Sequence, residues 1–270
     1  MTAQDKLKKQ NENFKFICVG LDTDIQKIPS SLKIVSNPIL EFNKRIIEAT
    51  LEYAAAYKFN LAFYEKDSAQ RLETLYESIQ LIPNDILIIG DGKRGDIGNT
   101  SEKYAQMLYD EFKFDSATLN PYMGKDSLEP FLVYKTKLNF ILALTSNSGA
   151  NDFEKLKLND NTFLYQEVIR KVKSWNVHRN CGLVFGATKK EELIRDIKLF
   201  DDLPILLPGV GAQGASLEDV VNIFKKHALS NFLINISRGI IYKSSNQDFA
   251  DKAREELMTM NESIVKIMKE

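Results

Sequence analysis

The sequence predicts a single (β/α)8 barrel domain over residues 1–270. The first observation is an alternation, repeated eight times, between short β-branched apolar runs and longer segments whose apolar residues recur at helical spacing. The second is that the short runs are apolar throughout, as expected of parallel strands with both faces buried. The third is that no linker, low-complexity segment or change of composition divides the chain. About 250 residues are typical of eight such units, whereas an open doubly wound sheet usually has fewer strands.

The expected strands and helices follow one another along the chain. The strands are expected at Phe14 to Leu21, Tyr57 to Tyr64, Asp85 to Ile89, Ala117 to Asn120, Phe140 to Thr145, Gly182 to Ala187, Ile205 to Pro208 and Phe232 to Ile236. The helices that follow them are expected at Pro38 to Ala56, Ser68 to Leu81, Thr100 to Phe112, Ser127 to Lys137, Thr162 to Trp175, Lys189 to Phe200, Leu217 to His227 and Asp248 to Met268. The longest irregular stretch, residues 146–161, follows the fifth strand on the side where barrel active sites lie, so we expect a functional loop there.

Composition and charge limit the classes of function. Hydrophobic residues make up 44% of the chain and charged residues 27%, which is typical of a globular protein and excludes a disordered, collagen-like or coiled-coil chain. With 36 basic and 37 acidic side chains, the net charge of -1 argues against a nucleic acid or a membrane surface as the partner. A local basic pocket is still compatible with that balance.

The cysteines and the hydropathy predict a soluble cytoplasmic protein. Cys18 and Cys181 lie far apart within apolar runs, which indicates buried thiols in a reducing compartment and not a disulfide framework. The polar segment 1–15 has no apolar core of signal-peptide length. No uncharged stretch reaches the roughly 18 residues that a membrane-spanning helix needs.

The carboxyl ends of the strands are the informative positions, because the loops that follow them build the active site of such a barrel. The third strand leads into the densest set of charges, Asp91, Lys93 and Asp96. On an extended backbone Asp91 and Lys93 point to the same side, toward the barrel mouth. A lysine held against carboxylates keeps its proton, which suits a general acid aimed at a developing carbanion. The alternative is an exposed loop of mixed charge, which the apolar strand before it and the helix after it argue against.

Two more charged residues point to the same place. Lys58 lies in the apolar second strand, and Asp22 follows the first. Each has a simpler interpretation as a solvated side chain just outside its strand. If both converge with the charges after the third strand, the signs alternate and nearly cancel, and this is how a protein tolerates buried charges.

A glycine-rich loop, Gly209-Val210-Gly211-Ala212-Gln213-Gly214, follows the seventh strand. The G-x-G-x-x-G pattern between a strand and a helix is typical of a dinucleotide site, but that site follows the first strand of its domain, and here only one strand remains. In barrels, the loops after the seventh and eighth strands bind phosphate through backbone N–H groups. Arg238 supplies a charge-assisted partner for the phosphate, and Gln213 supplies a side-chain donor.

A zinc site and a Ser-His-Asp triad have little support. The two histidines, His178 and His227, fall near helix ends and not at strand mouths, so we interpret both as surface residues. Trp175 and the sixteen phenylalanines mostly follow the apolar periodicity and are expected in the core.

The residues at the strand ends resemble one known family. The segment Asp91-Gly92-Lys93-Arg94-Gly95-Asp96-Ile97-Gly98-Asn99-Thr100 is similar to the D-x-K-R-G-D-I-x-x-T signature of one group of orotidine 5'-phosphate decarboxylases. Further blocks resemble that family in the same order along the chain: Val19-Gly20-Leu21-Asp22, Lys58-x-Asn60-x-Ala62-Phe63-Tyr64-Glu65, Asn120-Pro121-Tyr122, Thr145-Ser146-Asn147, Val184-x-Gly186-Ala187-Thr188, Pro208 through Gly214 and Ser237-Arg238. Together these blocks span the barrel from its first strand to its last.

The resemblance implies decarboxylation of orotidine 5'-phosphate to uridine 5'-phosphate, the last step of pyrimidine nucleotide synthesis, with no metal and no organic cofactor. It also implies a homodimer whose active sites lie at the subunit interface. In that family the lysine that matches Lys93 donates a proton to C6 of the pyrimidine, and the carboxylate that matches Asp91 lies beside the substrate carboxylate. Asp96 and Thr100 match residues that are supplied across the interface.

The remaining site residues carried over by the resemblance bind the rest of the nucleotide. Lys58 completes the alternating array and contacts the ribose, and Asp22 binds ribose hydroxyls. Ser146 matches the residue at the pyrimidine edge. The phosphate is assigned to Gln213, Arg238 and Gly239.

Two departures from the family pattern concern local loop shape. Phe59 stands where a proline often follows the lysine, and residues 66–71 lack the glycines expected there. Two other functions stay open at this stage. One is a related barrel that acts on 3-keto or hexulose 6-phosphates with magnesium, against which Lys58 and the R-G-D-I-x-x-T extension argue. The other is a non-catalytic nucleotide-binding barrel, which would have no reason to keep this charged array beside a phosphate loop.

Overall fold

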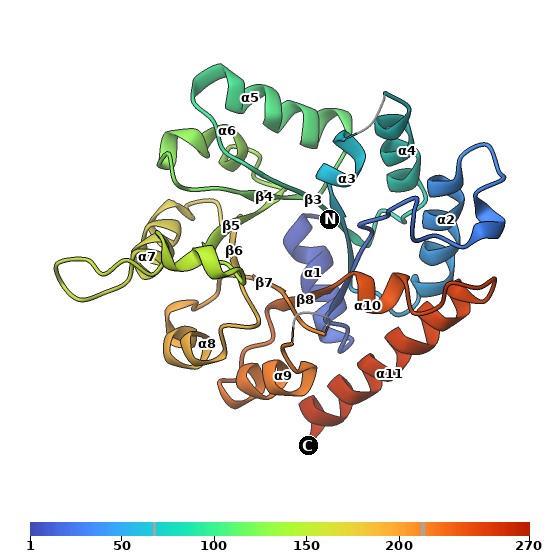
Figure 1. The fold of residues 1–270 in the computed structure, drawn as a ribbon. Helices are drawn as coiled ribbons and strands as arrows, with labels where there is room; N and C mark the ends of the chain where they lie inside the picture. Colours follow the sequence, from blue (N-terminus) through green and yellow to red (C-terminus); the bar gives the residue numbers. More distant parts are fainter. Residues whose placement is uncertain (67–68, 212–213) are drawn as a thin grey trace.

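The computed structural model describes residues 1–66, 69–211 and 214–270, and in this part of the chain eight parallel strands close into a barrel in the order of the sequence. Figure 1 shows the strands surrounded by a ring of helices. The strands are β1 (Ile17–Gly20), β2 (Ala56–Asn60), β3 (Leu87–Arg94), β4 (Ser116–Leu119), β5 (Leu138–Leu144), β6 (Cys181–Phe185), β7 (Ile205–Pro208) and β8 (Phe232–Ile236). The predicted (β/α)8 barrel is confirmed.

Eleven α-helices lie in the described ranges, and most of them connect consecutive strands on the outside of the barrel. They are α1 (Ala3–Glu12), α2 (Pro38–Thr50), α3 (Ala62–Glu65), α4 (Ala69–Gln80), α5 (Gly98–Gln106), α6 (Glu129–Leu132), α7 (Leu164–Trp175), α8 (Lys190–Asp196), α9 (Leu217–Lys226), α10 (Arg238–Ile241) and α11 (Phe249–Lys269). Ordinary signals start several of them. Asn37 caps α2 by accepting a hydrogen bond from the Leu40 N–H, and Pro38 fills its first turn.

The apolar side chains form two cores, because successive residues of a strand point to opposite faces. The inner core fills the barrel and contains Cys18, Ala56, Leu87, Ile89, Leu138, Phe140, Val184, Leu206 and Leu233. The outer core lies between the strands and the helices and contains residues such as Val19, Tyr57, Phe59 and Cys181. This two-sided burial explains why the strands are apolar throughout. Both cysteines are fully buried, free thiols, as the sequence predicts.

Helix α1 closes the amino-terminal end of the barrel and was not predicted. Its Ala3 and Leu7 pack against the inner core, and Figure 1 shows the helix near the centre of the helical ring. The buried ammonium of Lys6 binds both carboxylate oxygens of Asp115 at 2.7 Å. The Asn11 side chain donates hydrogen bonds to the carbonyls of Ser230 and Phe232. Because most of its anchors are polar, the segment lacks the apolar periodicity that identifies a helix in a sequence.

Several predicted boundaries are wrong. The expected strand from Tyr57 to Tyr64 ends at Asn60, and α3 occupies residues 62–65. The expected third strand from Asp85 to Ile89 starts and ends later, since β2 and β3 stay paired up to Asn60 and Asp91. The first predicted helix ends at Thr50 and not at Ala56.

Three other predicted helices are interrupted by tighter or wider turns. The helix expected at 127–137 is reduced to α6 after a 3-10 turn at Lys125–Ser127, and the one expected at 189–200 is split into α8 and a 3-10 turn at Ile197–Leu199. The helix expected at 100–112 continues from α5 into one π-helical turn at Met107–Glu111. Among the described residues, no helix is both long and apolar enough to cross a membrane.

We expect the Leu7→Ala substitution to lower the free energy of unfolding by about 2–5 kcal/mol, because Leu7 is 1% exposed and its removal leaves a cavity under the barrel. Urea unfolding followed by circular dichroism measures this change. The matched control is Lys8→Ala on the exposed face of α1, which should change the free energy by less than about 0.5 kcal/mol. Equal effects of the two substitutions would contradict the role of α1 as a closing element.

Candidate active site

A cavity of about 390 Å³ opens at the carboxyl ends of the strands. Residues at or directly after the ends of all eight strands contribute to it, and this is the end at which (β/α)8 barrels carry their active sites. The predicted site residues that line the cavity are Asp22, Lys58, Asp91, Lys93, Ser146, Arg238 and Gly239. The structure therefore brings together seven predicted site residues that are spread over more than 200 positions of the sequence.

The charges at the base of this cavity alternate in sign. Lys58 Nζ lies 2.7 Å from Asp91 Oδ2 and 3.6 Å from Asp22 Oδ1. Lys93 Nζ lies 2.7 Å from Asp91 Oδ1. Lys58 and Asp91 are buried, whereas the Lys93 side chain is 48% exposed and reaches the open part of the cavity. Of the five charged residues predicted to converge, these four meet in the structure, whereas Asp96 does not line the cavity.

The array keeps its buried groups charged. Burial alone would raise the pKa of Asp91, but the ammonium groups of Lys58 and Lys93 outweigh it and hold that pKa well below its ordinary value. Burial alone would lower the pKa of Lys58, but the carboxylates of Asp91 and Asp22 outweigh it and hold that pKa above its ordinary value. Both groups are therefore ionised throughout the neutral pH range.

The backbone at Lys93 differs from the sequence-based expectation. Asp91 and Lys93 both lie on β3, but Lys93 has a φ of 47°, in the left-handed region, so the strand is not extended at this residue. Their side chains nevertheless meet, because the chain bulges between Gly90 and Arg94. The buried hydroxyl of Thr118 on β4 bonds to both residues, to the Lys93 N–H at 2.9 Å and to Asp91 Oδ1 at 2.7 Å. Thr118 was not singled out from the sequence, although a hydroxyl one residue from the mouth end of an apolar strand is a usable signal.

The segment directly after β1, which carries Asp22, is held by two tyrosines. The Tyr64 hydroxyl donates to the Leu21 carbonyl at 2.8 Å. The Tyr242 hydroxyl accepts from the Asp24 N–H at 2.7 Å and donates to the Asp22 carbonyl at 3.2 Å. Asp22 is thus positioned by its backbone, although nothing in the spacing of these tyrosines predicts the contact.

The loop at residues 146–161, predicted to be functional, borders the cavity through Ser146 and Asn147. The carboxylate of Glu154 closes the base of this loop by accepting from the Thr145 N–H at 2.7 Å. The Thr145 hydroxyl contacts Glu154 at 2.9 Å and Asn147 Oδ1 at 2.6 Å. A 3-10 turn at Ser148–Asn151 follows. The loop is therefore anchored next to the residue that the sequence places in the site.

The loop after β7 turns through glycines with positive φ, 102° at Gly209 and 81° at Gly211, which favour this residue type. Gly209 lines the cavity beside Arg238 and Gly239, which follow β8. Gln213, the predicted phosphate donor, lies outside the described residues. The motif follows the seventh strand of a closed barrel, so its place in the fold is not that of a dinucleotide-binding loop.

Asp96 and Thr100 do not line the cavity within one chain. Asp96 is half-buried and accepts a hydrogen bond from the Ile97 N–H at 2.8 Å, and Thr100 is exposed in α5. The sequence places both residues in the site only through a second subunit, and the cavity of the single chain lacks them.

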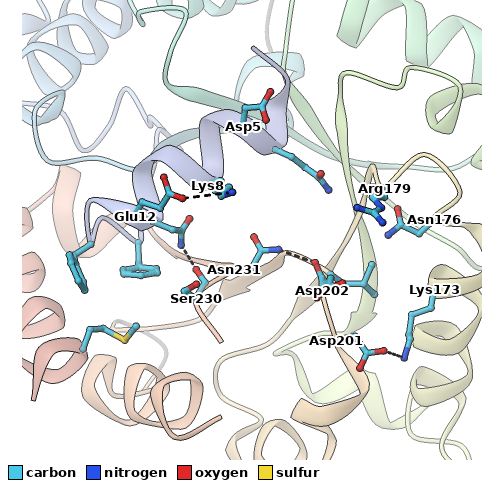
Figure 2. Close-up of a pocket in the computed structure, with 16 residues that line it drawn as sticks. Asp5, Lys8, Glu12, Lys173, Asn176, Arg179, Asp201, Asp202, Ser230 and Asn231 are labelled. Carbon is cyan, nitrogen blue, oxygen red and sulfur yellow. Dashed lines mark hydrogen bonds and ion pairs between the residues drawn. The ribbon is translucent and has the colours of Figure 1, made fainter. Parts of the chain in front are cut away.

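A wider groove of about 890 Å³ lies at the opposite end of the barrel, beside α1. Figure 2 shows that the groove is lined by both acidic and basic side chains. Lys173 pairs with Asp201, and Lys8 pairs with Glu12. The groove combines four carboxylates with three cations along an open surface and has no buried charged group. This end of a (β/α)8 barrel usually serves stability, so the smaller cavity at the mouth is the candidate site.

The residues described by the structure contain no group of three or more His, Cys, Asp and Glu side chains arranged to hold a metal ion. The two histidines, His178 and His227, lie outside the cavity at the mouth.

Comparison with known proteins decides the family. A model of the orotidine 5'-phosphate decarboxylase / HUMPS family matches residues 15–253. The chain is 43% identical to orotidine 5'-phosphate decarboxylase of Flavobacterium johnsoniae over 99% of its own length and 98% of the relative. It is 44% identical to the enzyme of that name from Dehalococcoides mccartyi, with 98% and 97% of the two chains covered. The chain belongs to the orotidine 5'-phosphate decarboxylase family.

A solved structure agrees with this assignment. The OMP decarboxylase of Leishmania donovani superposes with a TM-score of 0.81 at 35% identity, over 97% of this chain and 99% of that one. Membership of the orotidine 5'-phosphate decarboxylase family makes the protein an enzyme, a carboxy-lyase of pyrimidine biosynthesis. The family and activity predicted from the strand-end motifs are therefore confirmed.

We expect Asp91→Asn to lower the free energy of unfolding by about 3–5 kcal/mol at pH 7, because it leaves the buried Lys58 with only the more distant Asp22. Since folding lowers the pKa of Asp91, its stabilising contribution is complete above the ordinary carboxyl pKa of about 3.9 and declines as the pH falls below it. Urea unfolding at pH 7 and pH 3 measures both effects.

The control for this prediction is Asp202→Asn, which removes an exposed carboxylate. It should leave the free energy of unfolding within about 0.5 kcal/mol of the wild type at both pH values. A difference between Asp91→Asn and the wild type that stays constant down to pH 3 would show that Asp91 is not held charged by its neighbours.

Proposed function

We propose that this enzyme converts orotidine 5'-phosphate to uridine 5'-phosphate and CO2, with the ammonium group of Lys93 as the proton donor to C6. The observation that carries the proposal is the position of Lys93 Nζ, which lies in the cavity and is fixed by a 2.7 Å contact to a carboxylate that stays charged. The names of the relatives support the substrate. No metal or organic cofactor enters the reaction as proposed.

The chemistry explains why a fixed cation is needed. When the bond between C6 and the carboxyl carbon breaks, CO2 leaves and the electron pair stays on C6, where the ring cannot delocalise it. A preorganised ammonium group next to C6 stabilises this charge as it develops. Lys93 then transfers one N–H proton to C6, and the neutral amine regains a proton from water through the exposed side of the cavity.

Asp91 has two roles in this proposal. Its carboxylate fixes the direction of Lys93 Nζ, and it lies where the substrate carboxylate must enter. Because the two lysines keep Asp91 ionised, the carboxylates of enzyme and substrate repel each other in the bound state and this repulsion is relieved when CO2 leaves.

The other site residues are proposed to bind the parts of the nucleotide that do not react. Lys58 and Asp22 face the ribose, and Ser146 faces the pyrimidine edge. Arg238 and Gly239, which line the cavity, bind the phosphate together with Gln213, which lies outside the described residues. The free energy of phosphate binding then holds C6 next to Lys93, although the phosphate itself does not react.

We propose that the active enzyme is a homodimer in which Asp96 and Thr100 complete the neighbouring subunit's site. Apolar side chains are unusually exposed next to this segment: Ile97 is 63% exposed, Tyr122 76% and Phe153 57%. The rings of Tyr122 and Phe153 are in contact, with centroids 6.0 Å apart. An apolar patch at the rim of an incomplete site supports contact with a second copy of the chain. Two buried free thiols and a nucleotide substrate support a cytoplasmic location.

We expect Lys93→Ala to lower kcat by about 10⁴-fold or more while uridine 5'-phosphate still binds within about tenfold of the wild-type Kd, because the substitution removes the proton donor and leaves the phosphate and ribose contacts. Conversion of orotidine 5'-phosphate to uridine 5'-phosphate, followed in EDTA, measures the activity.

The same assay tests the reaction itself. Wild-type turnover in EDTA would agree with the proposal. Turnover that EDTA abolishes would favour the metal-dependent relatives, and absence of turnover without EDTA would contradict orotidine 5'-phosphate as the substrate. Near-normal kcat of Lys93→Ala would refute the role of Lys93 as proton donor.

We expect mixtures of the inactive Asp96→Ala and Lys93→Ala variants to regain activity, because a hybrid dimer contains one site with both residues intact. Random exchange makes half of the dimers hybrid with one good site each, so about a quarter of wild-type activity should return. A matched control mixes Lys58→Ala with Lys93→Ala, whose residues belong to the same half-site, and should stay inactive. If the first mixture stays inactive despite exchange of subunits shown by mass spectrometry, Asp96 does not act across an interface.

A further inference from the structure

We propose that Thr118 is a positioning residue that fixes both the main chain of Lys93 and the carboxylate of Asp91. The inference rests on the proposed role of Lys93 and adds to it the reason why this lysine points at the reacting carbon. Thr118 is 1% exposed and lies on β4 at the base of the cavity, beneath the two charged residues.

The hydrogen bonds of Thr118 have only one possible direction. The Lys93 N–H can only donate, so Thr118 Oγ1 accepts from it at 2.9 Å. The ionised Asp91 carboxylate can only accept, so the single hydroxyl proton of Thr118 is donated to Oδ1 at 2.7 Å. The hydroxyl therefore connects the backbone of the lysine to the carboxylate that holds its ammonium group.

The strand pairing explains why a side chain is needed here. On the two sides of the irregularity, Gly90 pairs with Ala117 and Arg94 with Leu119. Three residues of β3, numbers 91–93, therefore face Thr118 alone, and β4 offers no regular backbone partner to each of them. The Thr118 hydroxyl takes the place of that partner for Lys93, whose φ of 47° is costly for a residue other than glycine.

Three donors fix the Asp91 carboxylate, and they bind both of its oxygens. Its Oδ1 accepts from Thr118 and from Lys93 Nζ, and its Oδ2 accepts from Lys58 Nζ. Donors on both oxygens leave the carboxylate plane little freedom to rotate. Among the described residues, Thr118 is the one neutral group that donates to this carboxylate, so its loss leaves the carboxylate plane set by the two lysines alone and the direction of Lys93 Nζ less well defined.

The test compares Thr118→Val, which keeps the shape and loses the hydroxyl, with Thr118→Ser, which keeps the hydroxyl. We expect Thr118→Val to lower kcat about 10- to 100-fold with KM within about threefold, as for the loss of a hydrogen bond to a charged group. Thr118→Ser should stay within about threefold of the wild-type kcat.

The control substitution is Ser116→Ala, two residues earlier on the same strand. The Ser116 hydroxyl is buried and has no hydrogen-bond partner among the described residues, so its removal should leave kcat and KM unchanged. If Thr118→Val keeps wild-type kcat, if Thr118→Ser loses as much as Thr118→Val, or if the loss appears in KM, Thr118 is not a positioning residue.

A measurement without substrate separates this inference from the proposed reaction. Hydrogen exchange of the Lys93 amide, followed by NMR, should be about tenfold faster or more in Thr118→Val than in the wild type, and close to wild type in Thr118→Ser. Unchanged exchange in Thr118→Val overturns the Thr118 inference even if the enzyme is active. Absence of wild-type turnover overturns the proposed function, whereas faster exchange in Thr118→Val would still support the contact. If Thr118→Val does not fold, Thr118→Ala supplies the same comparison.

Discussion

The carboxylate of Asp91 lies between two ammonium groups, and much of the barrel mouth depends on this arrangement. Asp91 and Lys58 are buried beneath the cavity, where an unpaired charge would be strongly unfavourable. Their 2.7 Å contact joins the ends of two neighbouring strands, β2 and β3, and makes the burial of both tolerable. Lys93 can then extend into the open cavity while its Nζ is held at a fixed place.

The parts of the fold that follow from repeated local patterns were predictable. Eight apolar strand runs with helical segments between them define the barrel, and residues such as Asp22, Lys58 and Arg238 were assigned to its mouth because strand ends converge there. The length of β3 was not predictable in this way, because Asp91 and Lys93 are charged and a hydropathy pattern ends before them. The place of Asp91 in the ladder depends on its pairing with Asn60 of β2, which is a contact between distant parts of the chain.

The polar contacts that hold the site were also invisible in the sequence. Thr118, Tyr64 and Glu154 each make a hydrogen bond to a backbone group elsewhere in the chain. Such contacts leave no periodicity and no motif, since their geometry arises only when the barrel closes. Helix α1 was missed for the same reason. Its buried Lys6 and Asn11 bind to Asp115 and Ser230, which lie directly before β4 and β8 at the amino-terminal end of the barrel.

The two cysteines lie in different cores, so each can report on the opening of its own core. Cys18 lies in the inner core and Cys181 in the outer one, and burial raises the pKa of each thiol to about 12. Because the thiolate is the reactive form, the native protein offers neither sulfur to an alkylating reagent. The alkylation rate of Cys18 therefore reports how often the barrel interior opens. The alkylation rate of Cys181 reports how often the surrounding helices detach from the strands.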